Sequence, residues 1–221
     1  MLVKICGVSN AIDARVAVQS GADAIGFVMG GRVLPSEVEP HAQTVREIIG
    51  AFPKHVDGYL VTHLYDAEDI LALSDYIRSS GIQVSEDVGI ETMKALRFRT
   101  SKKIIKTIVV DATTALQKMK ECEPYCDFIL LDSRVGGYVG GTGATNDWDV
   151  CGTLIDSAAK PVYLAGGLTP ENLLAAVRTT HPFGVDVSTG VSTYSDAYLR
   201  KDRKDPEKIK KFITRAKNFR S

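Results

Sequence analysis

The stretch VYLAGGLTP at residues 162–170 joins a short apolar segment to the start of a helix through two adjacent glycines. Val162–Leu164 is apolar and bounded by turn residues, which is typical of a buried strand. Thr169 and Pro170 can serve as N-cap and first-turn residue, so we expect a helix to begin there. A strand, a tight turn and a helix in this order predict one unit of a parallel α/β fold.

The same order recurs along the whole chain. Amphipathic helical segments separate short apolar runs, as is typical of parallel strands covered by helices. The runs are Leu2–Cys6, Ala24–Val28, Tyr59–Thr62, Ile82–Ser85, Lys103–Val110, Phe128–Asp132, Val162–Leu164 and Val185–Val187. About eight strand–helix units fit an α/β fold of the single-domain (β/α)8 or TIM-barrel type, spanning residues 1–221. A doubly wound open sheet is the alternative, but Cys6-Gly7-Val8-Ser9 lacks its dinucleotide-binding glycine pattern.

The helical segments are predicted from apolar residues spaced three or four apart. Ser9 is expected to cap the first helix, and Asp205-Pro206 to open the last. The predicted inward residues are Ile12, Ala14, Val16 and Val18; Val45, Ile48 and Ile49; Ile70, Leu73 and Ile77; Met93 and Leu96; Leu116 and Met119; and Ile209, Phe212, Ile213 and Ala216. Asp149–Ser157 is also expected to be helical.

Composition excludes several other classes. The 221 residues contain 27 Lys plus Arg and 27 Asp plus Glu, giving a formal net charge of +0, which argues against a strongly basic nucleic-acid binder. No apolar run approaches the roughly 20 residues that span a bilayer. The N-terminal segment becomes polar too soon for a signal peptide. Cys6, Cys122, Cys126 and Cys151 are scattered, as expected for free thiols, so we expect a cytoplasmic protein.

Three glycine loops follow late strands in the predicted barrel. They are Gly166-Gly167 after the seventh strand, Val187–Gly190 after the eighth, and Gly140–Gly143 after the sixth. Exposed backbone N–H groups beside a helix start can bind phosphate without a lysine, and barrels often place phosphate after their last two strands. Turn glycines needed only for positive φ are the alternative, but three such loops favour a phosphate site.

Cys6 and Asp132 end the first and sixth predicted strands. The carboxyl ends of barrel strands share one mouth, so the two side chains are expected to face the same site. A thiol can act as a general base and a carboxyl group as a general acid. Alone, Cys6 could be a small buried apolar residue and Asp132 a loop cap. With the phosphate loops, they predict acid–base chemistry on a sugar phosphate.

At these residues the sequence resembles the phosphoribosylanthranilate isomerases of tryptophan biosynthesis. The similarity runs in order through nearly the whole chain. The matching segments are Lys4–Gly7, Gly21–Val28, Leu130–Ser133, Gly140–Gly143 with Asp147-Trp148, Leu164–Asn172, Gly184–Val191 and Lys204–Ile209. The resemblance implies a (β/α)8 barrel that isomerises N-(5-phosphoribosyl)anthranilate by an Amadori rearrangement, without a metal or an organic cofactor.

The resemblance also implies roles for individual residues. Cys6 would be the general base that removes the C2′ proton, and Asp132 the general acid that protonates the ribose ring oxygen. Asp186 would lie near the ribose hydroxyls, and Arg32 would meet the anthranilate carboxylate. The residues that would hold the phosphate are Gly141, Thr142, Gly143, Gly166, Gly167, Ser188 and Gly190.

Two segments depart from the family pattern, both on the side that would recognise the aromatic ring. The family's longer Ser-Pro-Arg loop is replaced by MGGRVLP at residues 29–35, and its Gln-Leu-His-Gly by QVSE at residues 83–86. These changes leave two alternatives: a related barrel acting on another phosphorylated sugar, or a non-catalytic barrel that binds a phosphorylated ligand. Retention of both Cys6 and Asp132 disfavours the non-catalytic alternative.

Metal binding and large partners are not favoured by the sequence. The four histidines do not fall at strand ends in the arrangement of a metal-dependent epimerase, and Cys122-Glu123-Pro124-Tyr125-Cys126 has no second cysteine pair to complete a zinc site. We expect a small phosphorylated substrate, no nucleic-acid or membrane partner, and a monomer or homodimer.

Overall fold

A computed structural model describes residues 1–30, 35–132, 134–135, 138–139, 147–193 and 203–219. Strands and helices alternate along these segments. The strands are β1 Leu2–Ile5, β2 Ala24–Val28, β3 Asp57–Thr62, β4 Gly81–Val84, β5 Lys103–Val109, β6 Phe128–Asp132, β7 Arg134–Val135, β8 Tyr138–Val139, β9 Val162–Leu164 and β10 Gly184–Val187. The α-helices are α1 Ala11–Gln19, α2 Pro35–Gly50, α3 Ala67–Tyr76, α4 Ile90–Arg99, α5 Ala115–Cys122, α6 Trp148–Ser157, α7 Leu173–Thr180 and α8 Pro206–Asn218, with short 3-10 helices at Glu123–Tyr125 (η1) and Thr189–Val191 (η2).

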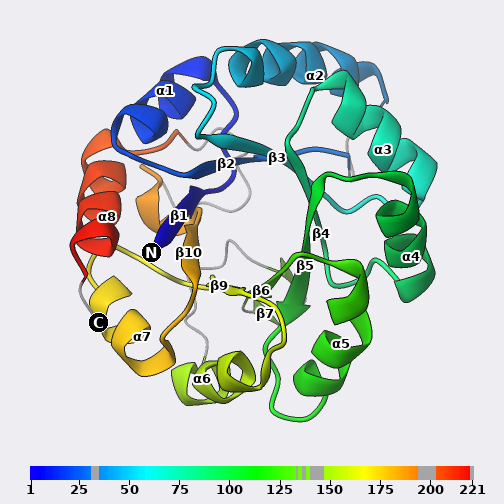
Figure 1. Ribbon diagram of the computed structural model, residues 1–221. Helices are drawn as coiled ribbons and strands as arrows, with labels where there is room; N and C mark the ends of the chain where they lie inside the picture. The colour runs from blue at the N-terminus through cyan, green and yellow to red at the C-terminus, as the bar shows by residue number, and fades with distance from the viewer. Residues whose placement is uncertain (31–34, 133, 136–137, 140–146, 194–202, 220–221) are drawn as a thin grey trace.

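The main sheet is a closed parallel barrel. Its strands follow each other around the ring in the order β1-β10-β9-β6-β5-β4-β3-β2, and β10 pairs with β1 from Leu2 opposite Gly184 to Ile5 opposite Val187. Figure 1 shows the α-helices as an outer ring around these strands. The predicted (β/α)8 barrel is therefore confirmed, whereas the assignment of residues 1–221 to a single domain stays a prediction. The sequence did not predict β7 and β8, which form a separate antiparallel pair.

In the barrel interior, large tyrosine side chains pack against glycines of neighbouring strands. A β-carbon on Gly81 would lie 2.2 Å from the Tyr59 ring, and one on Gly184 would lie 2.5 Å from the Tyr163 ring. Each tyrosine therefore occupies the space that a neighbouring glycine leaves empty. This interdigitation fills the barrel with side chains, so its lower part is a packed core and leaves only the mouth for a ligand.

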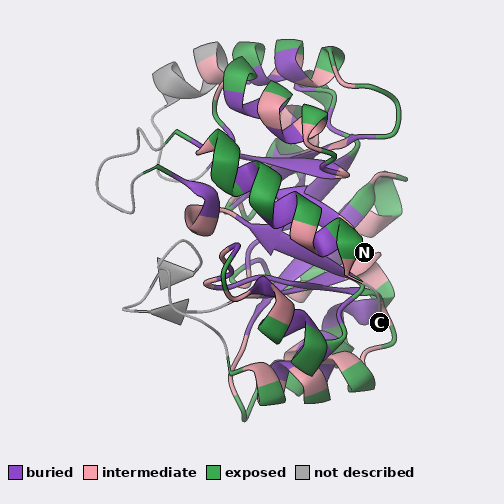
Figure 2. Cartoon of the chain, turned by 90° about the vertical axis from the view of Figure 1, so that its left-hand side faces the viewer, coloured by how far each residue is buried: buried purple, intermediate pink, exposed green. Residues whose placement is uncertain are grey.

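The second core lies between the barrel and its helices. Figure 2 shows buried strands enclosed by helices whose outer faces are exposed. Ile209, Phe212, Ile213 and Ala216 of α8 are all buried, which confirms the predicted inward face of this helix. α8 packs on β1, α1 and α7, and so covers the seam where the first and last strands meet.

Helices α1 and α5 differ from the sequence prediction in their cap or in the face that they bury. Asn10, and not Ser9, caps α1, because the Asn10 side chain accepts a hydrogen bond from the backbone N–H of Asp13. The α1 face turned inward carries Asp13 and small alanines, so Ile12 is left 61% exposed. In α5 the buried residues are Ala115, Met119 and Cys122, and Leu116 is 44% exposed. Both errors arise because tertiary contacts select a helix face that hydrophobicity alone does not reveal.

Candidate active site

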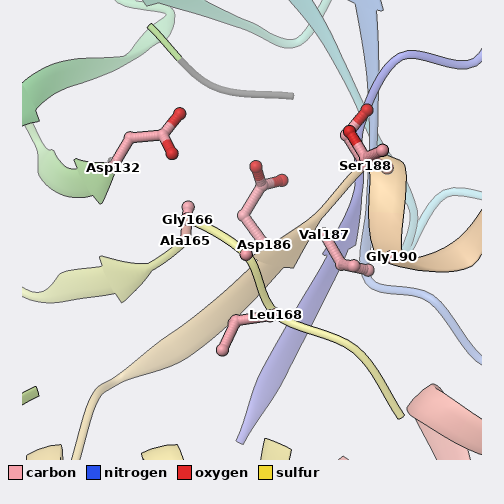
Figure 3. A pocket seen from close by; sticks show the side chains of 10 residues that line it. Asp132, Ala165, Gly166, Leu168, Asp186, Val187, Ser188 and Gly190 are labelled. Atoms are coloured by element: carbon pink, nitrogen blue, oxygen red, sulfur yellow. The ribbon is translucent and has the colours of Figure 1, made fainter. Parts of the chain in front are cut away.

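An open pocket lies at the carboxyl ends of β6, β9 and β10. Its walls are Asp132, the loop Ala165–Leu168 and the segment Asp186–Gly190. Figure 3 shows the side chains of Asp132, Asp186 and Ser188 around this pocket, with the glycine backbone of the loop after β9 between them. The structure thus brings together six of the predicted site residues, namely Asp132, Gly166, Gly167, Asp186, Ser188 and Gly190.

The remaining predicted residues divide into two groups. Cys6 follows β1, which pairs with β10, and lies just behind the pocket wall with an exposure of 7%. Arg32 and Gly141–Gly143 fall outside the described residues, so their predicted roles stay predictions.

Strand order fixes how Cys6, Asp132 and the glycine loops are arranged. β9 and β10 are neighbours in the ring, β1 lies beyond β10, and β6 lies beyond β9. Cys6 and Asp132 therefore flank the two strands that carry the glycine loops. A ligand whose phosphate binds after β9 and β10 would extend its next atoms between the thiol and the carboxyl group.

The loop after β9 is shaped for an anion. Gly166 and Gly167 have φ of +82° and +65°, a region that favours glycine. Asn172 donates its side-chain amide to the Gly167 carbonyl at 2.9 Å and accepts from the N–H of Thr169 at 2.8 Å. Within the part of the chain that the structure describes, the N–H groups of Gly166 and Gly167 donate to no protein acceptor. Such N–H groups can bind a phosphate oxygen.

The helix after this loop begins later than the sequence predicts. α7 begins at Leu173, and Asn172 occupies its N-cap position. Thr169 accepts hydrogen bonds through its hydroxyl from the N–H groups of Glu171 and Asn172, so it caps a preceding turn. This turn separates the two glycines from the helix start, so the loop backbone contributes more to an anion site than the helix dipole does.

The loops after β9 and β10 touch at Gly190. A β-carbon there would lie only 1.8 Å from the carbonyl oxygen of Leu168. Glycine is therefore required at this position because two backbones approach closely, and not because the residue adopts a positive φ. The contact keeps the two loops together as one surface.

Cys6 lies in a buried network of charges. Lys4, fully buried in the barrel, forms an ion pair of 2.8 Å with Asp186. Gly26 provides space for this group, because a β-carbon there would lie 2.9 Å from the Cys6 sulfur and 3.0 Å from the Lys4 ammonium. Burial lowers the pKa of Lys4, but attraction to Asp186 and Cys6 outweighs it, so the pKa is raised above its usual value.

The Cys6 thiol is subject to opposing effects. Burial raises its pKa above the usual value, and the negative charge of Asp186 acts in the same direction. Lys4 and Lys204 oppose this, because positive charge favours the thiolate. The backbone N–H of Cys6 donates to the Val187 carbonyl at 2.9 Å, which fixes the thiol relative to β10.

Sequence reasoning missed Lys4 and Lys204. The alternation of a strand could have revealed Lys4, since it lies two residues before Cys6 and therefore on the same face. Lys204 begins the matching segment Lys204–Ile209, but the resemblance assigned it no role, because it reaches the site from the start of the last helix, far along the chain.

The opposite side of the mouth is formed by β4 and its loop. β4 lies four strands from β10 in either direction around the ring. Lys106 donates its ammonium to the carbonyls of Ser85, Glu86 and Val88 at 2.7, 2.9 and 2.6 Å, which holds this loop. Gln83 Oε1 and Ser85 Oγ are buried, and among the described residues neither has a hydrogen-bond partner.

Outside this mouth, the described residues offer no metal centre. Among them, no group of three or more His, Cys, Asp or Glu side chains is placed to hold a metal ion. Cys122 and Cys126 are both buried, and the Cys122 thiol contacts the Met119 carbonyl at 3.2 Å. Over the same residues, no helix is both long and apolar enough to cross a membrane.

A closed (β/α)8 barrel with a thiol, carboxylates and glycine loops around one mouth defines the class as a barrel enzyme. Comparison with known proteins identifies the family within this class. The family model for N-(5′-phosphoribosyl)anthranilate (PRA) isomerase matches residues 3–215. This chain belongs to that family of isomerases.

Individual relatives agree along their full length. The N-(5′-phosphoribosyl)anthranilate isomerase of Methanothrix thermoacetophila is 32% identical over 98% of both chains, and that of Geotalea uraniireducens is 36% identical over 98% of both. The crystal structure of the Thermotoga maritima enzyme matches with a TM-score of 0.80 and 30% identity, covering 99% of this chain and all of that one. A further phosphoribosylanthranilate isomerase structure, with a TM-score of 0.77, contains reduced 1-(o-carboxyphenylamino)-1-deoxyribulose 5-phosphate.

Proposed function

We propose that the chain converts N-(5′-phosphoribosyl)anthranilate to 1-(2-carboxyphenylamino)-1-deoxyribulose 5-phosphate, an Amadori rearrangement in tryptophan biosynthesis. Membership of the family supports this reaction. The observation that supports the mechanism is the placement of Cys6 and Asp132 on the two strands that flank the glycine-loop strands β9 and β10.

The phosphate of the substrate binds to the loops after β9 and β10. Backbone N–H groups of Gly166 and Gly167 donate to its oxygens, with Ser188 and Gly190 on the facing loop. The ribose then lies between β1 and β6, and Asp186 lies close to its hydroxyls. Asp132 protonates the ring oxygen as the C1′–O bond breaks, which opens the ring to an imine.

Cys6 completes the rearrangement from the other side. As a thiolate it removes the proton from C2′. The electron pair of the broken C–H bond forms the C1′=C2′ double bond of an enolamine, which carries both the amine and an enol hydroxyl group. Tautomerisation of the enol then gives the 2-keto product, so the reaction moves protons and double bonds without adding or removing atoms. Lys4 and Lys204 support this role because their charges stabilise the thiolate against the burial that raises its pKa.

The aromatic half of the substrate extends away from the phosphate, toward the β2–β4 side of the mouth. Arg32, in the loop after β2, is the proposed partner of the anthranilate carboxylate. The ligand of the related structure described above is a small phosphorylated compound of the same kind. Either a monomer or a homodimer is compatible with this site, and the Thermotoga maritima enzyme is described as a dimer from which monomers were generated.

The test is steady-state turnover of freshly made phosphoribosylanthranilate, followed by the loss of its anthranilate-type fluorescence. We expect turnover by the wild-type chain, large losses in Cys6→Ala and Asp132→Ala, and little change in Cys151→Ala, which removes another buried thiol away from the mouth. Complementation of a tryptophan auxotroph lacking this isomerase checks the same activity in cells.

Three outcomes would count against the proposal. Absence of turnover by folded wild-type protein rejects the reaction, and turnover of a different phosphorylated sugar would favour a related barrel activity. Undiminished turnover in Cys6→Ala rejects the thiol as the base.

A further inference from the structure

The pocket wall poses an electrostatic problem for a phosphorylated ligand. Asp132 and Asp186 are both part of the wall, and none of the residues that line it is a lysine or an arginine. Backbone N–H groups carry only partial charges, whereas a phosphate monoester carries close to two negative charges at neutral pH. In the described part of the chain, positive charge must therefore act from behind the wall.

Lys204 lies directly behind this wall. Its ammonium donates to the carbonyl of Ser188 at 3.1 Å, to the Ser188 hydroxyl at 3.3 Å and to the Ser192 hydroxyl at 3.3 Å. Ser188 lines the pocket, so only one residue separates this cation from the ligand space. Lys204 is 4% exposed, which keeps water from screening its charge.

The backbone of Lys204 is anchored independently of its side chain. Its N–H donates to the buried carboxylate of Asp13 in α1 at 3.0 Å, and the residue forms an antiparallel bridge with Ser192. Lys204 thus links α1, the start of α8 and the loop after β10. The bond to Asp13 fixes the start of the Lys204 side chain on α1.

The same ammonium also lies close to the end of β1. A β-carbon on Gly7 would lie 3.5 Å from the Lys204 ammonium and 2.7 Å from the Ser188 hydroxyl. The residue after Cys6, the phosphate loop and Lys204 therefore meet at one point. One cation at this point can act on both the phosphate and the thiol.

We infer that Lys204 is a positioning residue for phosphate binding, which orients Ser188 and supplies positive charge to the loop after β10. This role rests on the proposed function, because it assigns the cation that supports the phosphate end of that substrate. Lys204 does not touch the reacting atoms and acts through Ser188. The ligand class it favours is a phosphate monoester dianion over an uncharged sugar.

The experiment compares Lys204→Met, Lys204→Arg and Lys208→Met. Lys208 is a matched control, because its ammonium donates to the Ser192 carbonyl at 3.0 Å in the same loop but makes none of the Ser188 contacts. Inorganic phosphate is titrated into each protein and followed by NMR of the amides of Gly166, Gly167 and Gly190. KM and kcat for phosphoribosylanthranilate are measured in parallel.

Lys204→Met is expected to raise the phosphate dissociation constant and KM by about tenfold or more, the size of a lost charge-assisted interaction. Lys204→Arg should recover most of this loss, and Lys208→Met should match the wild type. If Lys204→Met proves unstable, Lys204→Gln takes its place, because it removes the charge but keeps a hydrogen-bond donor, and it should weaken phosphate binding in a folded protein.

Equal phosphate affinity in Lys204→Met and Lys208→Met would overturn the inference. A fall in kcat alone, with phosphate affinity and KM unchanged, would also overturn it. The phosphate titration does not depend on turnover, so wild-type protein that binds phosphate but does not isomerise the substrate would reject the proposed reaction and leave the role of Lys204 testable.

Discussion

Gly7 is the residue at which the thiol strand and the phosphate loop meet. Its φ is +69°, and a β-carbon would lie 2.7 Å from the Ser188 hydroxyl. Any side chain here must therefore strain the backbone and displace the Ser188 hydroxyl. The geometry of Cys6 relative to that loop depends on this absence of a side chain.

Gly7→Ala is expected to reduce stability by about 1–3 kcal/mol, because it combines left-handed strain with a steric clash. It should also lower kcat/KM by more than the loss of folded protein explains, since Ser188 must move. Chemical denaturation and steady-state kinetics measure the two effects.

Gly50→Ala is the control for this substitution. Gly50 ends α2, and a β-carbon there meets nothing within 4 Å, so alanine should leave stability equal or higher. Equal effects of Gly7→Ala and Gly50→Ala would contradict the steric argument.

The pH dependence of the reaction should report on Cys6. Burial raises the pKa of its thiol above the usual value, so at neutral pH only a small fraction is thiolate. That fraction grows about tenfold per pH unit below the pKa, and kcat/KM should therefore rise with pH through the neutral and mildly alkaline range. The rise should disappear in the residual activity of Cys6→Ala. A wild-type profile that falls with pH over this range would argue against a thiolate base.

Among elements, the loop after β4 depends on one buried lysine. Lys106 supplies hydrogen bonds to three carbonyls of residues 85–88, and burial lowers its pKa to about 8. Since this loop faces the loops after β9 and β10 across the mouth, its conformation sets the wall on the side proposed for the aromatic ring. These bonds add to the loop's own hydrogen bond from the Val88 N–H to the Ser85 carbonyl at 3.2 Å.

Lys106→Met should release this loop while leaving the barrel folded. We expect faster amide exchange over residues 85–88, a loss of about 1–3 kcal/mol in stability, and a higher KM for phosphoribosylanthranilate. Lys94→Met is the comparison, because Lys94 is 45% exposed and pairs with Glu91, which is 81% exposed, at 2.7 Å. An exposed pair contributes less than about 1 kcal/mol, so the comparison variant should change little. Unchanged exchange in Lys106→Met would contradict the role assigned to the lysine.

Elements also show where sequence reasoning succeeds. Phe128–Asp132 and Val162–Leu164 were predicted with the observed bounds, because a continuous apolar run bounded by polar or turn residues marks a buried strand. The face of α1 was mispredicted, since the buried carboxylate of Asp13 bonds to Lys204, a partner that no local pattern reveals. The predicted strand ends were enough to place Cys6 and Asp132 at one mouth. The buried cations Lys4 and Lys204 were found only from the folded structure.

At the scale of the whole molecule, the barrel is closed by its two chain ends. β1 pairs with β10, and α8 covers that seam, so residues from the start and end of the chain stabilise each other. The site lies over the same seam, because Cys6 follows β1 and the phosphate loop follows β10. The pairing of β1 with β10 that closes the barrel therefore also brings Cys6 next to the loop after β10.

Phe212 tests this dependence. Its side chain lies on the inward face of α8 and is fully buried, so Phe212→Ala should cost about 3–5 kcal/mol of unfolding free energy. Since the seam joins the whole barrel, we expect one cooperative transition in which the fluorescence of Trp148 in α6 and far-UV circular dichroism coincide. Phe98→Ala should change stability by less than about 0.5 kcal/mol, because Phe98 is 92% exposed. Two separated transitions in Phe212→Ala would mean that α8 and the seam unfold independently of the rest of the barrel.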